Sequence, residues 1–274
     1  MTFNTIMVQL DLDRQATPRL KFAWDLARRF EADMIAFAAA EAVPVGPIGE
    51  HTVGAGVVLH QQSQHIDGRL KALELEFQAV TNDDQRASWR GRVGNPTTLL
   101  ALHARAADLI VAGRPEHRPS RSRGTIDPGA LILSAGRPVL LHAEGLAPVR
   151  LETVVIAWKD TREAHRAVVD AIPFLTQAKD VLVVAVGDGD PAGARAGVAD
   201  VLRFLMRHGV SARSELVHVG GWQAADVVAE LALETGANLV VAGGYGHSRL
   251  REWALGGVTR SLLGEIELHR FFSN

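Results

Sequence analysis

Short apolar runs alternate with longer segments of helical periodicity along the whole chain. The runs are rich in Val, Ile and Leu and are apolar at successive positions, as strands are in a parallel sheet buried on both faces. In the first half, the predicted strands are residues 5–10, 34–39, 87–93, 109–112 and 138–142. In the second half, they are residues 153–158, 180–186, 212–218, 239–242 and 268–273.

Amphipathic segments separate these strands. Residues 17–30 show the helical period clearly, because their apolar side chains gather on one side of a helix. The other predicted helices are residues 61–81, 97–106, 128–134, 161–175, 191–208, 224–235 and 258–264. Alternation of strand and helix indicates parallel sheets covered by helices. The predicted fold class is therefore α/β, with two doubly wound domains.

The order of elements occurs twice, and short stretches of sequence recur with it. Residues 108–113, DLIVAG, return 130 residues later as NLVVAG, and Asp33 matches Asp180, 147 residues later. Offsets of this size indicate a duplicated domain, since a solenoid repeats every 20 to 50 residues or so. We expect domains at 1–146 and 147–274. The first is longer by about 17 residues, which we assign to a surface loop in the Pro/Gly-rich run 44–56.

Composition narrows the classes of protein that fit. A chain of 274 residues that is 47% hydrophobic can bury two cores, one for each half. The net charge of −2 argues against a nucleic-acid partner. There is no cysteine, which excludes disulfides and thiol catalysis and suggests a reducing compartment. No signal-like or membrane-spanning stretch occurs, so we expect a cytoplasmic protein without a membrane partner.

The fourth predicted strand of the second half runs directly into a glycine cluster. Residues 243–246 read GGYG, and Gly256–Gly257 follow a short amphipathic segment. Glycines let backbone N–H groups approach an anion closely, and a helix beginning near Val258 would add its positive end. Ligands of open α/β sheets bind at this edge. Turns and helix caps also use glycine, so the cluster by itself fits an ordinary turn equally well.

The spacing Gly243-x2-Gly246-x9-Gly256-Gly257 resembles the nucleotide-binding signature G-x2-G-x9-G-[Ser/Thr] of the universal stress protein family. The strand and helix order of both halves is similar to that of its tandem members. The resemblance implies two Rossmann-like domains, each with five parallel strands flanked by helices. It also implies a stress-responsive regulatory role, with ATP, and Mg²⁺ with it, as the ligand of the C-terminal half. Few members have an established catalytic activity, so no catalytic residue is assigned.

The resemblance also assigns the nucleotide-site residues of the second half. They are Ala157, Lys159, Val186, Gly243, Gly246, His247, Gly256, Gly257, Val258 and Thr259. Gly257 stands where Ser or Thr is usual, and Thr259 offers a hydroxyl two residues later. Lys159 stands where Asp is usual, with Asp160 beside it. A lysine cannot accept a hydrogen bond from ribose, but its ammonium can face a phosphate.

The first half departs further from the signature. Glu116 and Asp127 match Gly246 and Gly257, and each carboxylate would repel a phosphate by about 1 to 4 kcal/mol. Asp11 matches the family's first-strand carboxylate and would be a relic or a structural cap. We therefore expect no ATP in the first half.

Other features leave alternatives open. Arginines and a histidine gather at residues 114–123, as in a solvated loop or a docking site for an anion or a protein partner. The 11 histidines form no H-x-x-x-H pair, so no metal site is assigned. A slow ATP hydrolase would need a general base and a metal ligand, for which Asp160 and His247 are the candidates. A scaffold that binds no nucleotide is the third alternative.

The fifth predicted strand of each half would leave an unpaired sheet edge in an isolated domain. Domains of the family pair through these edges. Residues 138–142 and 268–273 supply both edges in one chain, so we expect an internal pseudo-dimer. A homodimer of the whole chain is left open.

Overall fold

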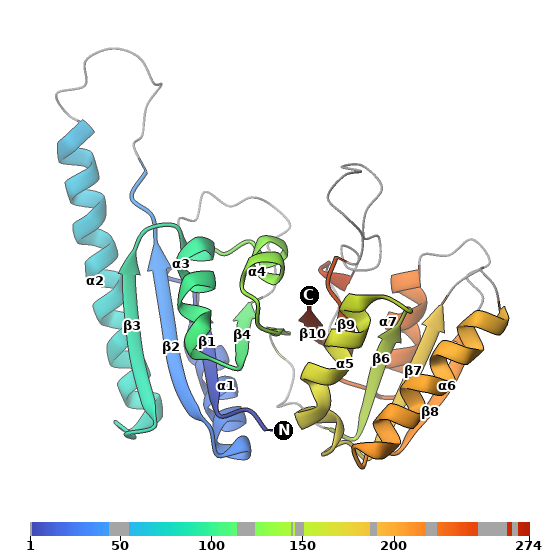
Figure 1. Cartoon of the computed structure of the whole chain (residues 1–274). Helices are drawn as coiled ribbons and strands as arrows, with labels where there is room; N and C mark the ends of the chain where they lie inside the picture. The colour runs from blue at the N-terminus through green and yellow to red at the C-terminus, as the bar shows by residue number, and fades with distance from the viewer. Residues whose placement is uncertain are drawn as a thin grey trace.

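The computed structural model describes residues 2–43, 55–113, 124–143, 145, 151–186, 191–217, 224–245, 262–264 and 268–274. Its strands are β1 (Thr5–Leu10), β2 (Asp33–Ala40), β3 (Ala87–Val93), β4 (Leu109–Gly113), β5 (Val139–His142), β6 (Thr153–Trp158), β7 (Asp180–Val186), β8 (Ala212–Val217), β9 (Leu239–Gly243) and β10 (His269–Ser273). These strands form one sheet in the order β3-β2-β1-β4-β5-β10-β9-β6-β7-β8 (Figure 1).

Helices cover both faces of this sheet. They are α1 (Thr17–Phe30), α2 (Ala55–Thr81), α3 (Pro96–His103), α4 (Pro128–Ser134), α5 (Arg162–Leu175), α6 (Pro191–Arg207) and α7 (Ala224–Glu234), with a 3-10 turn at Ala104–Ala106. The helices α1, α2, α5 and α6 pack on one face, and α3, α4 and α7 pack on the other. The α/β class and the two doubly wound halves are therefore confirmed.

The two halves join through an antiparallel pair of strands. All pairs within each half are parallel, whereas β5 and β10 run antiparallel, with Leu140 opposite Phe271. Each strand thus covers the edge that the other half would expose. The predicted internal pseudo-dimer is confirmed, and the sheet continues through it.

The hydrophobic core does not divide by halves as the composition suggested. One buried cluster lies on each face of the sheet, and each cluster contains residues of both halves. Phe3 packs on Phe30 and Phe174 with ring centroids 5.1 and 5.2 Å apart, and Phe174 packs on Phe271 at 5.9 Å. Because β5 and β10 fuse the two sheets, each face becomes one continuous apolar surface. The expectation of one core per half is therefore wrong.

Element boundaries differ from the predictions at a few places. The helix predicted from residue 61 begins at Ala55, so the end of the predicted loop 44–56 is helical, while residues 44–54 lie outside the described part. Leu70, Leu73 and Phe77 anchor this helix on the sheet, and the turns before them extend it. The helix predicted at 97–106 ends as an α-helix at His103 and tightens into the 3-10 turn. The junction between the predicted domains, 146–150, also lies outside the described part.

Candidate functional site

The carboxyl ends of β7, β6 and β9 meet at one edge of the sheet. Trp158 pairs with Ala185, and Ala157 pairs with both Val184 and Ala242. The strand order changes direction between β6 and β9, because their following connections leave toward β7 and toward β10. This is the place where open α/β sheets bind ligands.

Four of the residues assigned from the sequence lie along this edge. Ala157 is the penultimate residue of β6, Lys159 follows that strand, and Val186 and Gly243 end β7 and β9. Lys159 is exposed, while the other three are half-buried. The remaining six assigned residues, Gly246, His247, Gly256, Gly257, Val258 and Thr259, lie outside the described residues.

The amino end of α5 belongs to the same edge. The hydroxyl of Thr161 accepts a hydrogen bond from the Ala164 backbone N–H at 3.4 Å, which caps the helix. The helix dipole and the exposed Lys159 both favour an anion near this end. The carboxylate of Glu163, in the first helical turn, would instead repel an anion. Its Oε1 lies 3.1 Å from Nη2 of Arg162. The edge therefore carries exposed charges of both signs, since Asp160 is 72% exposed beside Lys159.

Two glycines at the end of β9 are required by packing. A Cβ on Gly243 would lie 2.6 Å from the Ala164 backbone nitrogen and 2.7 Å from the Glu163 carbonyl carbon. A Cβ on Gly244 would lie 2.5 Å from the Ile132 side chain, which belongs to α4 of the other half. Close approach of backbone to neighbouring atoms is one of the uses of glycine. These contacts account for two glycines of the cluster without any ligand.

The matching corner of the first half is filled by a buried arginine. Nη1 of Arg19 donates to the Asp11 carboxylate at 2.8 Å and to the Gln9 backbone carbonyl and side-chain oxygen at 3.0 Å each. The Arg19 and Asp11 side chains are 4% and 6% exposed. The guanidinium lies against Gly113, the counterpart of Gly243. Asp11 thus has a structural role, because it is half of a buried ion pair.

A second carboxylate occupies the amino end of α4. Oδ1 of Asp127 accepts a hydrogen bond from the Ala130 backbone N–H at 3.1 Å, so this helix end is already capped by an acidic group. Glu116 and the arginine-rich run 114–123 lie outside the described residues. The absence of ATP from the first half stays a prediction, which the capped helix end and the buried Arg19 favour.

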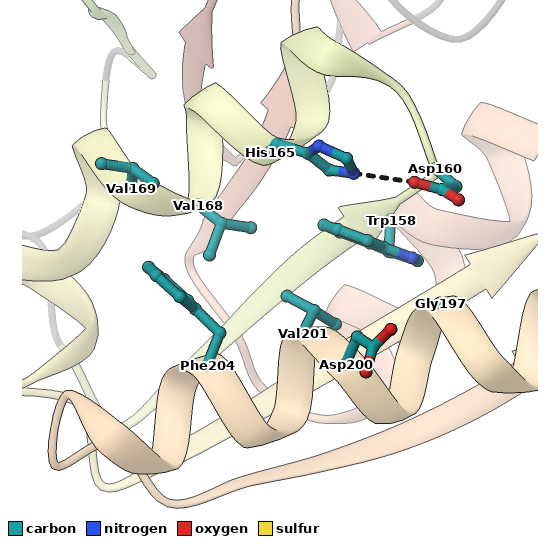
Figure 2. A pocket seen from close by; sticks show the side chains of 9 residues that line it. All are labelled: Trp158, Asp160, His165, Val168, Val169, Gly197, Asp200, Val201 and Phe204. Carbon is teal, nitrogen blue, oxygen red and sulfur yellow. Dashed lines mark hydrogen bonds and ion pairs between the residues drawn. The ribbon is translucent and has the colours of Figure 1, made fainter.

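Sequence analysis missed a pocket between α5 and α6. It has a volume of about 340 Å³ and lies beside the end of β6, with Trp158, Asp160 and His165 at one side (Figure 2). Trp158 is buried, and its indole also lines this pocket. The sequence offered only a weak sign of this pocket, namely Asp160 just before α5 and His165 five residues later in its first turns.

Two searches of the described residues bear on the class of site. No group of three or more histidine, aspartate or glutamate side chains in that part of the chain could hold a metal ion. None of the described helices has the length and apolar character needed to cross a membrane.

Comparison with known proteins gives matches in structure but not in sequence. No protein family model and no curated protein matches the chain. A universal stress protein from Archaeoglobus fulgidus DSM 4304 superposes with a TM-score of 0.70 and 13% identity, over 99% of this chain and 96% of that chain. A putative universal stress protein from Pseudomonas aeruginosa UCBPP-PA14 has a TM-score of 0.62 and 15% identity, over 99% and 93%.

A third match, the functionally unknown protein PA1789 from Pseudomonas aeruginosa PAO1, has a TM-score of 0.61 and 14% identity, over 99% of this chain and 92% of that chain. At these identities the matches show a shared fold. The chain therefore has the two-domain fold of universal stress proteins along nearly its whole length. The fold that the resemblance to universal stress proteins implied is therefore confirmed.

Proposed function

We propose that this protein is a stress-responsive regulator that binds an adenine nucleotide, ATP with Mg²⁺, at the edge formed by β7, β6 and β9. The observation that carries the proposal is the meeting of Lys159, Val186 and Gly243 at that edge. The fold shared with universal stress proteins supports it, since the glycine signature of the sequence begins at the same point.

Each described residue has a distinct part in this proposal. The backbone of Val186 would contact the adenine, and the ammonium of Lys159 would face the phosphates. A charge-assisted contact of this kind is about twice as strong as a neutral hydrogen bond. The glycine-rich segment after Gly243 would supply backbone N–H donors. The capped amino end of α5 adds a favourable dipole.

Slow hydrolysis of ATP is the second candidate, and one contact favours it. Nε2 of His165 lies 2.8 Å from Oδ1 of Asp160 at the same edge. A carboxylate held against an imidazole can accept a proton from water in general base catalysis. Release of inorganic phosphate from ATP, lost in His165→Gln, would support this candidate.

Equilibrium binding of labelled ATP with Mg²⁺ to the full chain tests the proposal. We expect saturable binding, with the Kd raised about tenfold by Lys159→Ala and more by Gly246→Glu, which copies Glu116. Lys179→Ala and Gly68→Glu are matched controls, because Lys179 lies on an exposed turn and a Cβ on Gly68 meets no atom within 4 Å. Absence of binding by both the wild type and Gly246→Glu would support a scaffold without nucleotide, whereas equal binding by the two proteins would contradict the proposed site.

A further inference from the structure

The pocket between α5 and α6 is built from three elements. Trp158 comes from the end of β6, His165 and Val168 come from α5, and Val201 and Phe204 come from α6 (Figure 2). None of the ten nucleotide-site residues assigned from the sequence lines it, although Asp160 of the same edge does. Its volume of about 340 Å³ is in the range of pockets that hold small ligands.

The inner walls of the pocket are apolar and aromatic. The indole of Trp158 stacks on the imidazole of His165, with ring centroids 5.2 Å apart and an interplanar angle of 21°. Nε2 of His165 is in turn held by Asp160 at 2.8 Å, which fixes the imidazole over the indole. From α6, Val201 lies near the Trp158 indole and Phe204 lies nearer to Val168 (Figure 2). Such walls favour a ligand with an apolar or aromatic body.

The charges at the mouth of the pocket are negative. Asp160 and Asp200 both line it, with side chains that are 72% and 71% exposed. Among the described residues that line the pocket there is no lysine or arginine. Arg203, which does not line the pocket, forms an ion pair with Asp200, and both side chains are largely exposed. Carboxylates together with aromatic faces attract an organic cation.

A glycine inside α6 keeps this mouth open. Gly197 lies in the body of the helix, where glycine is less favourable than alanine. A Cβ there would lie 3.7 Å from Oδ2 of Asp160, so any longer side chain would extend into the space between α6 and Asp160. The sequence thus accepts a poorer helix former at the position that borders the pocket.

The equivalent groove of the first half has a different character. It lies between α1 and α2, and four of its nine lining residues are charged, with both signs present. The charged residues are Lys21, Asp25, Arg28 and Glu76. Trp24 lines it too, but Arg86 already lies over that indole, 5.8 Å from the ring centroid. The apolar pocket with an acidic mouth is therefore a feature of the second half.

We propose that this pocket binds a small primary amine that carries an aromatic or branched apolar body. The ammonium lies between Asp160 and Asp200, and the body packs against Trp158, Val201 and Phe204. The proposal does not depend on nucleotide binding at the neighbouring edge.

Titration of 2-phenylethylamine into the full-length protein tests this site. The Trp158 indole N–H resonance is followed by nuclear magnetic resonance and is identified by its loss in Trp158→Phe. We expect this resonance to shift on saturation. We also expect 2-phenylethylamine to bind at least about tenfold more tightly than 2-phenylethanol, and phenylacetate to bind more weakly than both.

Variants distinguish the pocket from general surface attraction. Asp200→Asn should weaken amine binding by about three- to tenfold. Asp226→Asn, an exposed carboxylate of α7 on the other face of the sheet, should have no effect. Gly197→Met should abolish binding, whereas Ala196→Met, the neighbouring exposed position of α6, should leave it unchanged.

The proposal is overturned if the amine binds no better than the alcohol, or if Gly197→Met binds it as the wild type does. ATP binding by the wild type is measured in parallel, so that failure of the amine site is separated from failure of the nucleotide site.

Discussion

The hydroxyl of Tyr245 lies directly against Gly129, in the first turn of α4. Tyr245 belongs to the glycine-rich turn after β9, and α4 belongs to the other half of the chain. The backbone of Tyr245 has a φ of 56°, in the left-handed region that non-glycine residues seldom adopt. The contact therefore holds the turn of the candidate nucleotide edge against the opposite half.

Substitution of Gly129 should reveal this contact. We expect Gly129→Ala to lower the free energy of unfolding by about 1 kcal/mol, because the new Cβ overlaps the Tyr245 hydroxyl. In a Tyr245→Phe background the same change should cost less, because the overlapping hydroxyl is gone while the ring carbon still lies 3.3 Å from the new Cβ. Urea unfolding of all four proteins measures the coupling. Equal effects of Gly129→Ala in both backgrounds would contradict the contact.

Gly243 should be required for stability whether or not a nucleotide binds. We expect Gly243→Ala to cost about 3 kcal/mol, because its Cβ would meet backbone atoms of Glu163 and Ala164 that cannot rotate away. Gly68→Ala is the matched control, since a Cβ there is in open space in the body of α2 and should stabilise by about 0.5 to 1 kcal/mol. Urea unfolding of the nucleotide-free chain gives both values. A stable Gly243→Ala protein that loses only ATP binding would reverse this interpretation.

The parts of the fold that follow from local sequence were predictable. Strands such as β7 and β9 consist of consecutive apolar residues, and burial on both faces leaves few other arrangements for such runs. The duplicated order of elements predicted the two halves. The fifth predicted strand of each half, 138–142 and 268–273, marked the edges that pair. Each of these inferences needs only a segment and its immediate neighbours.

The details of the site depend on contacts between distant segments. Arg19 reads as a polar residue of an amphipathic helix, yet it is buried against Asp11. Gly244 reads as part of a phosphate loop, yet Ile132 of the other half explains its lack of a side chain. The pocket between α5 and α6 forms only when these two helices lie side by side. The periodicity of the sequence does not predict such contacts, because they depend on how distant segments pack together in the folded chain.

The ion pair of Arg19 and Asp11 should be strongly coupled. Asp11→Ala leaves a guanidinium buried without its carboxylate and should cost about 3 to 5 kcal/mol. The double variant Asp11→Ala with Arg19→Met should recover much of this loss, since no uncompensated charge remains. Glu152→Ala, which breaks the exposed pair with Lys179, should cost less than about 1 kcal/mol. Urea unfolding at neutral pH provides the comparison, and additive effects at positions 11 and 19 would refute the coupling.

His142 should make the junction of the two halves sensitive to acid. Its imidazole lies beside Phe22 and His269, with ring centroids 4.3 and 5.4 Å away. Burial, with additional repulsion from His269 and Arg19, lowers the pKa of His142 from 6.5 to about 3. Between these values the unfolded chain binds a proton that the folded chain rejects. The stability is therefore complete above about pH 6.5 and falls as the pH drops toward 3, by at most about 1.4 kcal/mol per pH unit.

Replacement of this imidazole separates its contribution from that of the carboxylates. His142→Phe keeps a ring beside Phe22 but cannot bind a proton, so its free energy of unfolding should change less between pH 6.5 and 4.5 than that of the wild type. His60→Phe, at an exposed position of α2, should retain the wild-type slope. Urea unfolding at closely spaced pH values measures each slope. If His142→Phe and the wild type lose stability in parallel, the acid sensitivity arises from groups other than His142.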